Sequence, residues 1–216
     1  MRESLSDEDD QGEEMIRIAV FASGRGSNFS ALARAQKKGV YKGSLSLLVC
    51  DNPKAPVIGK AKRAGVKVVL VKRGDFSSKA EFEQAIFQRL DEEGIGLIVM
   101  AGFMRMLSPE FVRRYKNRII NIHPALLPSF KGSHGIKDAF DYGVKVTGVS
   151  VHFVDEEMDH GPIILQKEVR VKEDDTVETL EARIHRAEHE LYPQAVRLFS
   201  EGRLKIEGRK VNISVR

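Results

Sequence analysis

The segment Ile119-Ile120-Asn121-Ile122-His123-Pro124-Ala125-Leu126-Leu127-Pro128 ends an apolar strand with an amide and an imidazole two residues apart. Side chains at this spacing lie on one face of a strand, so Asn121 and His123 are predicted to lie together. Pro124 lacks the N–H that a sheet requires, which predicts that the strand stops there. Open α/β sheets bind ligands at the carboxyl ends of their strands. The two side chains could donate hydrogen bonds to an oxyanion that forms at an acyl or formyl carbon. Alternatively, an Asn-x-His pair at a strand end can simply hydrogen-bond to the nearby backbone.

Strands and helices alternate along most of the chain. Apolar runs predict strands at 16–22, 45–50, 66–71, 97–101 and 118–122, and helical spacing predicts helices at 29–38, 55–64, 78–92 and from 108 onward. This alternation predicts a doubly wound, mostly parallel α/β sheet with helices on both faces. Further on, 147–153 and 163–171 are predicted to add antiparallel strands. Asp175-x-x-Glu178 is predicted to cap a long helix that ends near Ser200, and 211–215 to form a short strand.

Length and composition favour one domain at 15–216 after an acidic tail at 1–14. A chain of 216 residues is long enough for one well-buried core and marginal for two. The tail has one arginine against seven acidic residues and no signal-peptide pattern, so it is predicted to be disordered. No apolar run approaches the roughly 18 residues of a membrane span. Cys50 is the only cysteine, which excludes an internal disulfide and fits a reducing cytoplasm.

The charge balance favours small anionic ligands. Removing the tail's net charge of −6 from the formal +4 leaves about +10 on the rest of the chain, enough to help attract phosphates. Nucleic acid is the competing partner. The basic residues are interspersed with acidic ones, and no pattern of aromatic and basic residues typical of base stacking is present. We therefore expect no nucleic-acid partner.

A glycine-rich turn, Gly24-Arg25-Gly26-Ser27-Asn28, follows the first predicted strand and opens a helix. Backbone N–H groups and the helix dipole at such a turn can hold a phosphate. A dinucleotide site is the alternative, with Asp51 as its ribose-binding acid. That site needs a small residue where Phe29 stands, so a single phosphate fits better. A turn without a ligand remains open.

The segment His185-Arg186-Ala187-Glu188-His189 matches the H-x-x-E-H motif of inverted zinc proteases. Such a site needs another ligand well downstream, where Glu201 and Glu207 are the only carboxylates. We therefore expect no metal.

Three more segments flank Asn121-x-His123 along the sequence, and their order is typical of one enzyme family. The segment before it is Val99-Met100-Ala101-Gly102-Phe103-Met104-Arg105-Met106-Leu107-Ser108-Pro109, and the two after it are Ser150-Val151-His152-Phe153-Val154 and Met158-Asp159-His160-Gly161-Pro162. From about Arg17 to about Leu204 the chain resembles the folate-dependent formyltransferases of purine biosynthesis. The resemblance implies transfer of the formyl group of 10-formyltetrahydrofolate to the amine of glycinamide ribonucleotide. It also implies a cytoplasmic monomer or homodimer that needs no metal.

The resemblance assigns roles to residues. Asn121 and His123 are expected to hold the oxyanion, while Asp159 favours the imidazolium and relays a proton, often through water. His152 is expected to support them. The expected phosphate-binding residues are Gly26, Ser27 and Asn28. The expected neighbours of the ribose and amine are Glu188, Gly102, Met104, Ile122 and Pro124. The expected folate-binding residues are Met104, Arg105, Met106, Leu107, Asn121 and Asp159. His160 departs from the family, since many relatives carry glycine there.

Three alternatives remain open. Methionyl-tRNA formyltransferase resembles the same core but carries an additional C-terminal tRNA-binding domain, which we do not expect here. Formyltetrahydrofolate hydrolase uses a similar set of residues with water as the acceptor, usually after an N-terminal regulatory domain that a 14-residue acidic tail cannot form. A non-enzymatic nucleotide-binding module would leave the Asn, His and Asp set without a purpose.

Overall fold

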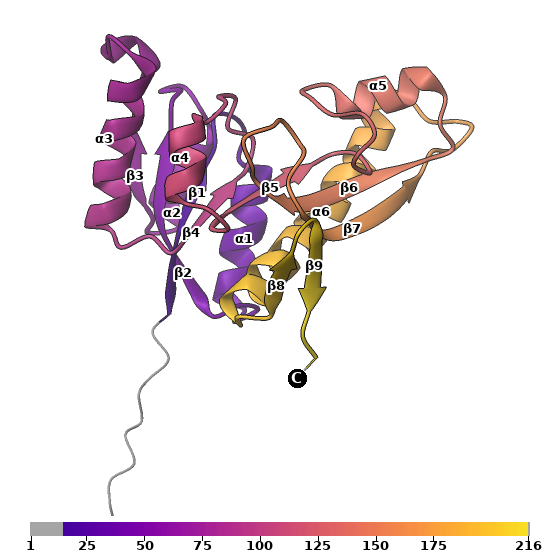
Figure 1. Ribbon diagram of the computed structural model, residues 1–216. Helices are drawn as coiled ribbons and strands as arrows, with labels where there is room; N and C mark the ends of the chain where they lie inside the picture. Colours follow the sequence, from indigo (N-terminus) through magenta and orange to yellow (C-terminus); the bar gives the residue numbers. More distant parts are fainter. Residues whose placement is uncertain (1–14, 216) are drawn as a thin grey trace, which may run out of the picture.

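The computed structural model describes residues 15–215, so the predicted disordered tail at 1–14 lies outside the described residues. Within that range the strands form one sheet in the order β3-β2-β1-β4-β5-β6-β7-β9-β8 (Figure 1). The strands are β1 (Ile16–Phe21), β2 (Gly43–Cys50), β3 (Lys67–Leu70), β4 (Leu97–Met100), β5 (Ile119–His123), β6 (Val146–Phe153), β7 (Ile163–Arg170), β8 (Leu204–Glu207) and β9 (Lys210–Ile213). The helices are α1 (Ser27–Lys37), α2 (Val57–Arg63), η1 (Arg73–Asp75), α3 (Lys79–Glu92), α4 (Pro109–Arg114), α5 (Gly135–Tyr142) and α6 (Val177–Ser200).

The sheet changes direction at β5. Strands β3, β2, β1, β4 and β5 pair in parallel, and β6 and β7 then continue the sheet antiparallel. The β5–β6 register sets Asn121 opposite His152 and His123 opposite Ser150. The doubly wound sheet with an antiparallel C-terminal addition is therefore confirmed.

Helices cover both faces of the sheet, because its central strands are apolar on both sides. Ile18 and Val20 of β1 pack in the layer beneath α1, α2 and α6, while Ala19 and Phe21 pack in the layer beneath α3 and α4. Alternation along a strand sends successive side chains to opposite faces. Burial of both faces is typical of parallel strands that helices connect.

Helix α6 is fixed to the sheet by a fully buried tyrosine. The hydroxyl of Tyr192 lies 2.7 Å from the carbonyl oxygen of Met100 and 3.1 Å from that of Ile120. These carbonyls belong to β4 and β5, so the contact holds α6 against the two strands that lead to the predicted site. Burial raises the pKa of Tyr192 well above its usual value, which keeps the hydroxyl protonated.

The predicted cap of α6 is one residue out. Thr176 is the N-cap, and its hydroxyl accepts from the N–H of Thr179 while the Thr179 hydroxyl accepts from the N–H of Thr176. The predicted pair of Asp175 and Glu178 does not form this box. Asp175 instead pairs with Arg183, so its carboxylate is already engaged. The predicted N-caps of α3 and α4 are confirmed, since the hydroxyls of Ser78 and Ser108 accept first-turn N–H groups.

Three elements were not predicted: the three-residue helix η1, helix α5 and strand β8. Helix α5 is short, begins at a glycine and has no side-chain cap, so it lacks the usual sequence signals of a helix start. Strand β8 has only four residues and pairs with β9 as a hairpin. This hairpin extends the sheet beyond β7, on the side of the antiparallel strands.

Candidate active site at the carboxyl edge of the sheet

Asp159 lies at the centre of the predicted catalytic group. Its Oδ1 accepts from Asn121 Nδ2 at 3.4 Å, and its Oδ2 lies 3.3 Å from His123 Nδ1. The backbone N–H of Gly132 donates to the same Oδ2 at 2.8 Å. His152 Nε2 lies 3.2 Å from Asn121 Nδ2 and 3.7 Å from Asp159 Oδ1. Four side chains from β5, β6 and the loop after β6 therefore meet in one cluster, as their predicted roles require.

The tautomer of His152 follows from its backbone contact. His152 Nδ1 lies 2.8 Å from the carbonyl oxygen of Phe153, an acceptor only, so Nδ1 carries a proton. In the neutral ring Nε2 then accepts from the Asn121 amide. His152 thereby orients the Asn121 side chain, which supports its predicted position behind the catalytic residues.

Burial alone would raise the pKa of the Asp159 carboxyl, but its neighbours lower it below its ordinary value. The lowering comes from the neighbouring rings of His152 and His123 and from the hydrogen bond that the Gly132 N–H donates. Asp159 is therefore an anion at neutral pH. An anion beside a histidine favours the imidazolium form of that ring.

A loop at 129–135 covers His123, which is only 3% exposed. The Phe130 carbonyl oxygen lies 2.7 Å from His123 Nε2, so this nitrogen also carries a proton. A Cβ at Gly135 would lie 3.1 Å from Nε2, which leaves little room for a side chain there. The sequence reasoning missed these contacts, although Gly132 and Gly135 mark a loop whose backbone approaches other groups closely.

The predicted phosphate-binding turn lies beside Glu188. Gly26 has a φ of 70°, and a Cβ there would lie 2.5 Å from Val57, so only glycine fits. The turn opens α1 without a side-chain cap, which leaves first-turn N–H groups for a ligand. Asn28 Nδ2 donates to Glu188 Oε2 at 3.0 Å, and both residues are buried. The structure thus joins the predicted phosphate and ribose residues across 160 positions.

His185 binds carboxylates on both sides. Its Nδ1 lies 2.9 Å from Glu188 and its Nε2 lies 3.1 Å from Glu181. The hydrogen bond with Glu188 raises the pKa of His185, against the effect of burial, so a cation is favoured near the turn. Burial lowers the pKa of His189. Across residues 15–215 no three or more metal-ligating side chains gather in a group that could hold a metal.

The loop that joins β4 to α4 is tied to the first two strands through Asp51. The Ser23 hydroxyl donates to Asp51 Oδ1 at 2.5 Å and accepts from the N–H of Met104 at 3.2 Å. Arg105 Nε donates to Asp51 Oδ2 at 2.5 Å. The sequence offers Asp51 as the ribose-binding acid of a dinucleotide site, but in the structure its carboxylate binds Ser23 and Arg105 and so holds this loop. The Arg105 side chain is therefore engaged within the protein.

The remaining predicted residues differ in exposure. Met104 and Met106 are 75% and 58% exposed, while Leu107 packs partly into the layer beneath α3 and α4. Gly102 has a φ of 80°, and Pro124 follows β5 directly. Ile122 is buried on the face of β5 opposite to Asn121 and His123, so its side chain does not join the cluster.

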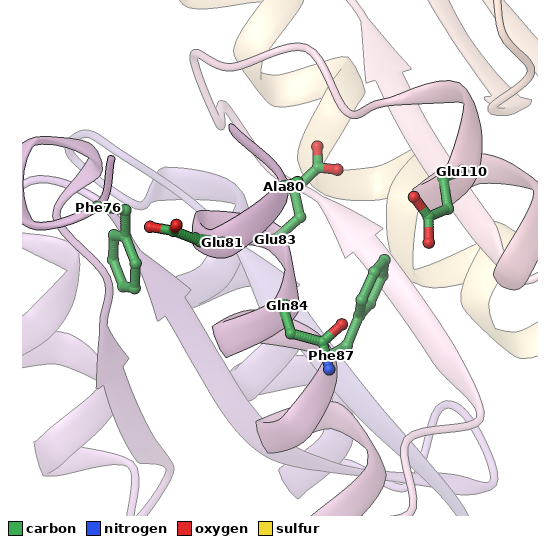
Figure 2. Close-up of a pocket in the computed structure, with 7 residues that line it drawn as sticks. All are labelled: Phe76, Ala80, Glu81, Glu83, Gln84, Phe87 and Glu110. Carbon is green, nitrogen blue, oxygen red and sulfur yellow. The ribbon is translucent and has the colours of Figure 1, made fainter. Parts of the chain in front are cut away.

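A cavity of about 520 Å³ lies away from the cluster, between α3 and α4 (Figure 2). It is lined by Phe76, Ala80, Glu81, Glu83, Gln84, Phe87 and Glu110. The Glu83 carboxylate is already bound to the N–H and hydroxyl of Ser108. A rim of carboxylates repels an anionic substrate, so we assign no ligand to this cavity.

Known proteins share both the sequence and the fold. A sequence model described as formyl transferase matches residues 16–196. Phosphoribosylglycinamide formyltransferase of Bacillus subtilis is 45% identical over 183 residues, which are 85% of this chain and 94% of that protein. Glycinamide ribonucleotide transformylase 1 from Symbiobacterium toebii has a crystal structure with a TM-score of 0.91 and 44% identity, over 94% of this chain and 95% of that one.

A related hydrolase is also similar. The crystal structure of formyltetrahydrofolate deformylase from Burkholderia mallei has a TM-score of 0.85 and 28% identity, and the match covers 94% of this chain and 71% of that one. Among the described residues no helix is long and apolar enough to span a membrane. The family match covers β5, β6 and the loop that carries Asp159, and the chain belongs to the formyl transferase family.

Proposed function

We propose that this enzyme transfers the formyl group of 10-formyltetrahydrofolate to the amine of glycinamide ribonucleotide, in purine biosynthesis. The observation that carries the proposal is the meeting of Asn121, His123 and Asp159 at the carboxyl edge of the sheet, within 3.4 Å of one another through Asp159. The similarity to phosphoribosylglycinamide formyltransferases at 37% to 45% identity supports this choice of substrates.

In the proposed reaction the amine nitrogen attacks the formyl carbon directly. A bond forms between them while the electron pair of the formyl C=O moves onto its oxygen. The Asn121 amide and His123 Nε2–H then donate hydrogen bonds to this oxyanion. Donors that are already in position stabilise the negative charge as it develops in the transition state. Nε2 now donates to the Phe130 carbonyl, so the substrate oxygen takes the place of that carbonyl.

Asp159 handles the proton in this proposal. Its carboxylate accepts a proton from the attacking amine, directly or through one water, and that proton passes to N10 of the folate as the C–N10 bond breaks. Tetrahydrofolate leaves, and the C=O of the product forms again. The position of the Asp159 carboxylate beside Asn121 and His123 supports this role.

The substrate-binding residues follow the same layout. The N–H groups of Gly26, Ser27 and Asn28 would hold the ribonucleotide phosphate at the start of α1, and Glu188 would accept from the ribose hydroxyls. The exposed side chains of Met104 and Met106 would cover the folate ring, with backbone groups of Arg105 and Leu107 bonding its edge. Gly102, Ile122 and Pro124 would then contribute backbone around the amine.

The test is the rate of tetrahydrofolate formation from 10-formyltetrahydrofolate, with and without glycinamide ribonucleotide. We expect turnover only with the ribonucleotide, and formylated product in equal amount. No turnover in either case would contradict the proposal.

Hydrolysis of 10-formyltetrahydrofolate is the second candidate, because a formyltetrahydrofolate deformylase shares 28% identity and the fold. Water would then replace the amine as the acceptor, with formate as the product. Equal rates with and without the ribonucleotide, together with formate release, would favour this reaction. The higher identity to the transferases supports transfer instead.

A further inference from the structure

The loop at 154–162 holds Asp159 in an unfavourable backbone conformation. Asp159 has a φ of 48°, in the left-handed region that few residues other than glycine adopt. At the end of the loop a Cβ on Gly161 would lie 1.8 Å from the Phe153 carbonyl oxygen, so the backbone packs closely there. A residue in such a conformation persists only when its surroundings fix it. The contacts of this loop therefore decide where the Asp159 carboxylate lies.

His160, the residue next to Asp159, is held from two sides. Its Nδ1 donates to Asp155 Oδ2 at 2.7 Å, and Asp155 Oδ1 accepts from the N–H of Glu157 at 3.0 Å. Its Nε2 accepts from Arg209 Nη1 at 2.9 Å, and Arg209 Nη2 donates to the His160 carbonyl oxygen at 2.6 Å. One guanidinium thus binds both the ring and the backbone of the residue beside Asp159.

Arg209 comes from an element that is otherwise remote from the site. It stands in the β8–β9 turn, directly after Gly208, whose φ is 60°. Strand β9 pairs with β7 through Lys210 and Ile163, so the turn is fixed beside the end of the 154–162 loop. The Arg209–His160 contact joins positions 49 residues apart.

We propose that Arg209 is a positioning residue for this enzyme: through His160 it holds the 154–162 loop so that Asp159 lies against Asn121 and His123. This inference rests on the proposed function. Its physical basis is that a misplacement of about 1 Å far from the reacting atoms can cost on the order of a hundredfold in rate. The hairpin would then contribute to catalysis without touching a substrate.

The experiment compares variants that separate geometry from charge. Arg209→Gln removes both the guanidinium and its charge, whereas Arg209→Lys keeps the charge and loses the two parallel hydrogen bonds. Lys205→Gln is the matched control, because Lys205 lies on the same hairpin and pairs with Glu207 instead of the loop. His160→Leu removes the other partner of the contact.

We expect Arg209→Gln, Arg209→Lys and His160→Leu each to lower kcat on the order of tenfold, with KM for both substrates nearly unchanged. Lys205→Gln should keep the original kcat. The Arg209→Gln/His160→Leu double variant should be no slower than either single one, because both act through one contact. An Arg209→Lys variant with the original kcat would overturn the proposal, since charge and not geometry would then matter.

A second readout does not depend on activity. Carbon-13 NMR of the Asp159 carboxyl should give a pKa that rises toward its ordinary value in both Arg209 variants and stays unchanged in Lys205→Gln. An unchanged titration in Arg209→Gln would overturn the positioning role. If the original chain transferred no formyl group, the proposed function would fail, and this titration would still decide whether Arg209 places Asp159.

Discussion

At the scale of single residues, the Asn121 amide is a donor aimed at the site, since it already donates to the Asp159 carboxylate. Asn121→Ala should lower kcat on the order of a hundredfold or more, the usual cost of one lost oxyanion donor. Far-ultraviolet circular dichroism should be unchanged. Asn212→Ala is the control, because Asn212 lies on exposed β9 and bonds Glu207. Near-normal turnover of Asn121→Ala would remove this amide from the mechanism.

Asp159 also links pH to stability. Because its pKa in the folded protein lies below the ordinary 3.8, the ionised carboxylate stabilises the fold above that pH, and this stabilisation is lost as pH falls through the folded pKa. Asp159→Asn should therefore lower the free energy of unfolding by about 1 to 2 kcal/mol at neutral pH. The difference should shrink below pH 3.8.

Urea titrations at both pH values measure this difference. Asp141→Asn is the control, because Asp141 is exposed and pairs only with a lysine one helical turn away, a kind of pair that contributes little. A deficit for Asp159→Asn that grows as the pH falls would contradict the sign of the shift.

The sequence predicted that Asn121 and His123 lie on one face of a strand, but it did not predict which groups surround them. Asn121 and His123 follow from two-residue spacing at a strand end, which is a local rule. The contact of Phe130 with His123 depends on the conformation of a loop. Asp51 binds Arg105, which is 54 positions away in the sequence. A local sequence pattern cannot predict a contact between residues so far apart in the chain. Contacts of this kind arise from tertiary structure.

At the scale of secondary-structure elements, one hydroxyl joins α6 to two strands. Tyr192→Phe leaves the ring in place but removes the buried donor to the carbonyls of Met100 and Ile120. We expect the free energy of unfolding to fall by about 1 to 3 kcal/mol, because buried carbonyls lose a partner. Urea unfolding measures the loss. Tyr142→Phe, at a tyrosine that is 80% exposed, should change stability little, and an equal loss in both variants would contradict this argument.

Local sequence patterns predicted some helices and strands better than others. Strands such as Leu97–Met100 are continuous apolar runs between polar turns, so their pattern was sufficient. The predicted N-cap of α6 was one residue too early, because Asp175 and Thr176 can each cap a helix. The Asp175 carboxylate binds Arg183, so Thr176 is the N-cap. Helix α5 gave no cap signal at all. Its conformation depends on packing against α6.

At the scale of the whole molecule, the net charge of about +10 outside residues 1–14 should assist the binding of anionic substrates. The apparent KM for glycinamide ribonucleotide should therefore rise with potassium chloride, by several-fold as the Debye length falls toward about 3 Å near 1 M. Sucrose at the same osmolality is the control and should leave KM unchanged. A KM that does not respond to salt would mean that the overall charge plays no part in substrate capture.

The parallel half of the sheet was predictable because strands and helices alternate along the chain, and this pattern leaves few topologies. The extension through β9 and β8 was not, since it depends on one parallel contact between Ile163 and Lys210. A single domain at 15–216, a cytoplasmic location and the oligomeric state stay predictions.

The pairing of Asn121 with His152 across β5 and β6 also limits how the length of this chain can evolve. Because side chains alternate, deleting one residue within β6 before His152 would turn that imidazole to the opposite face and bring an apolar side chain beside the amide. Insertions and deletions in β6 should therefore be purged during divergence. Length variation should accumulate instead in the connection between α5 and β6, where an added residue leaves the strand register intact.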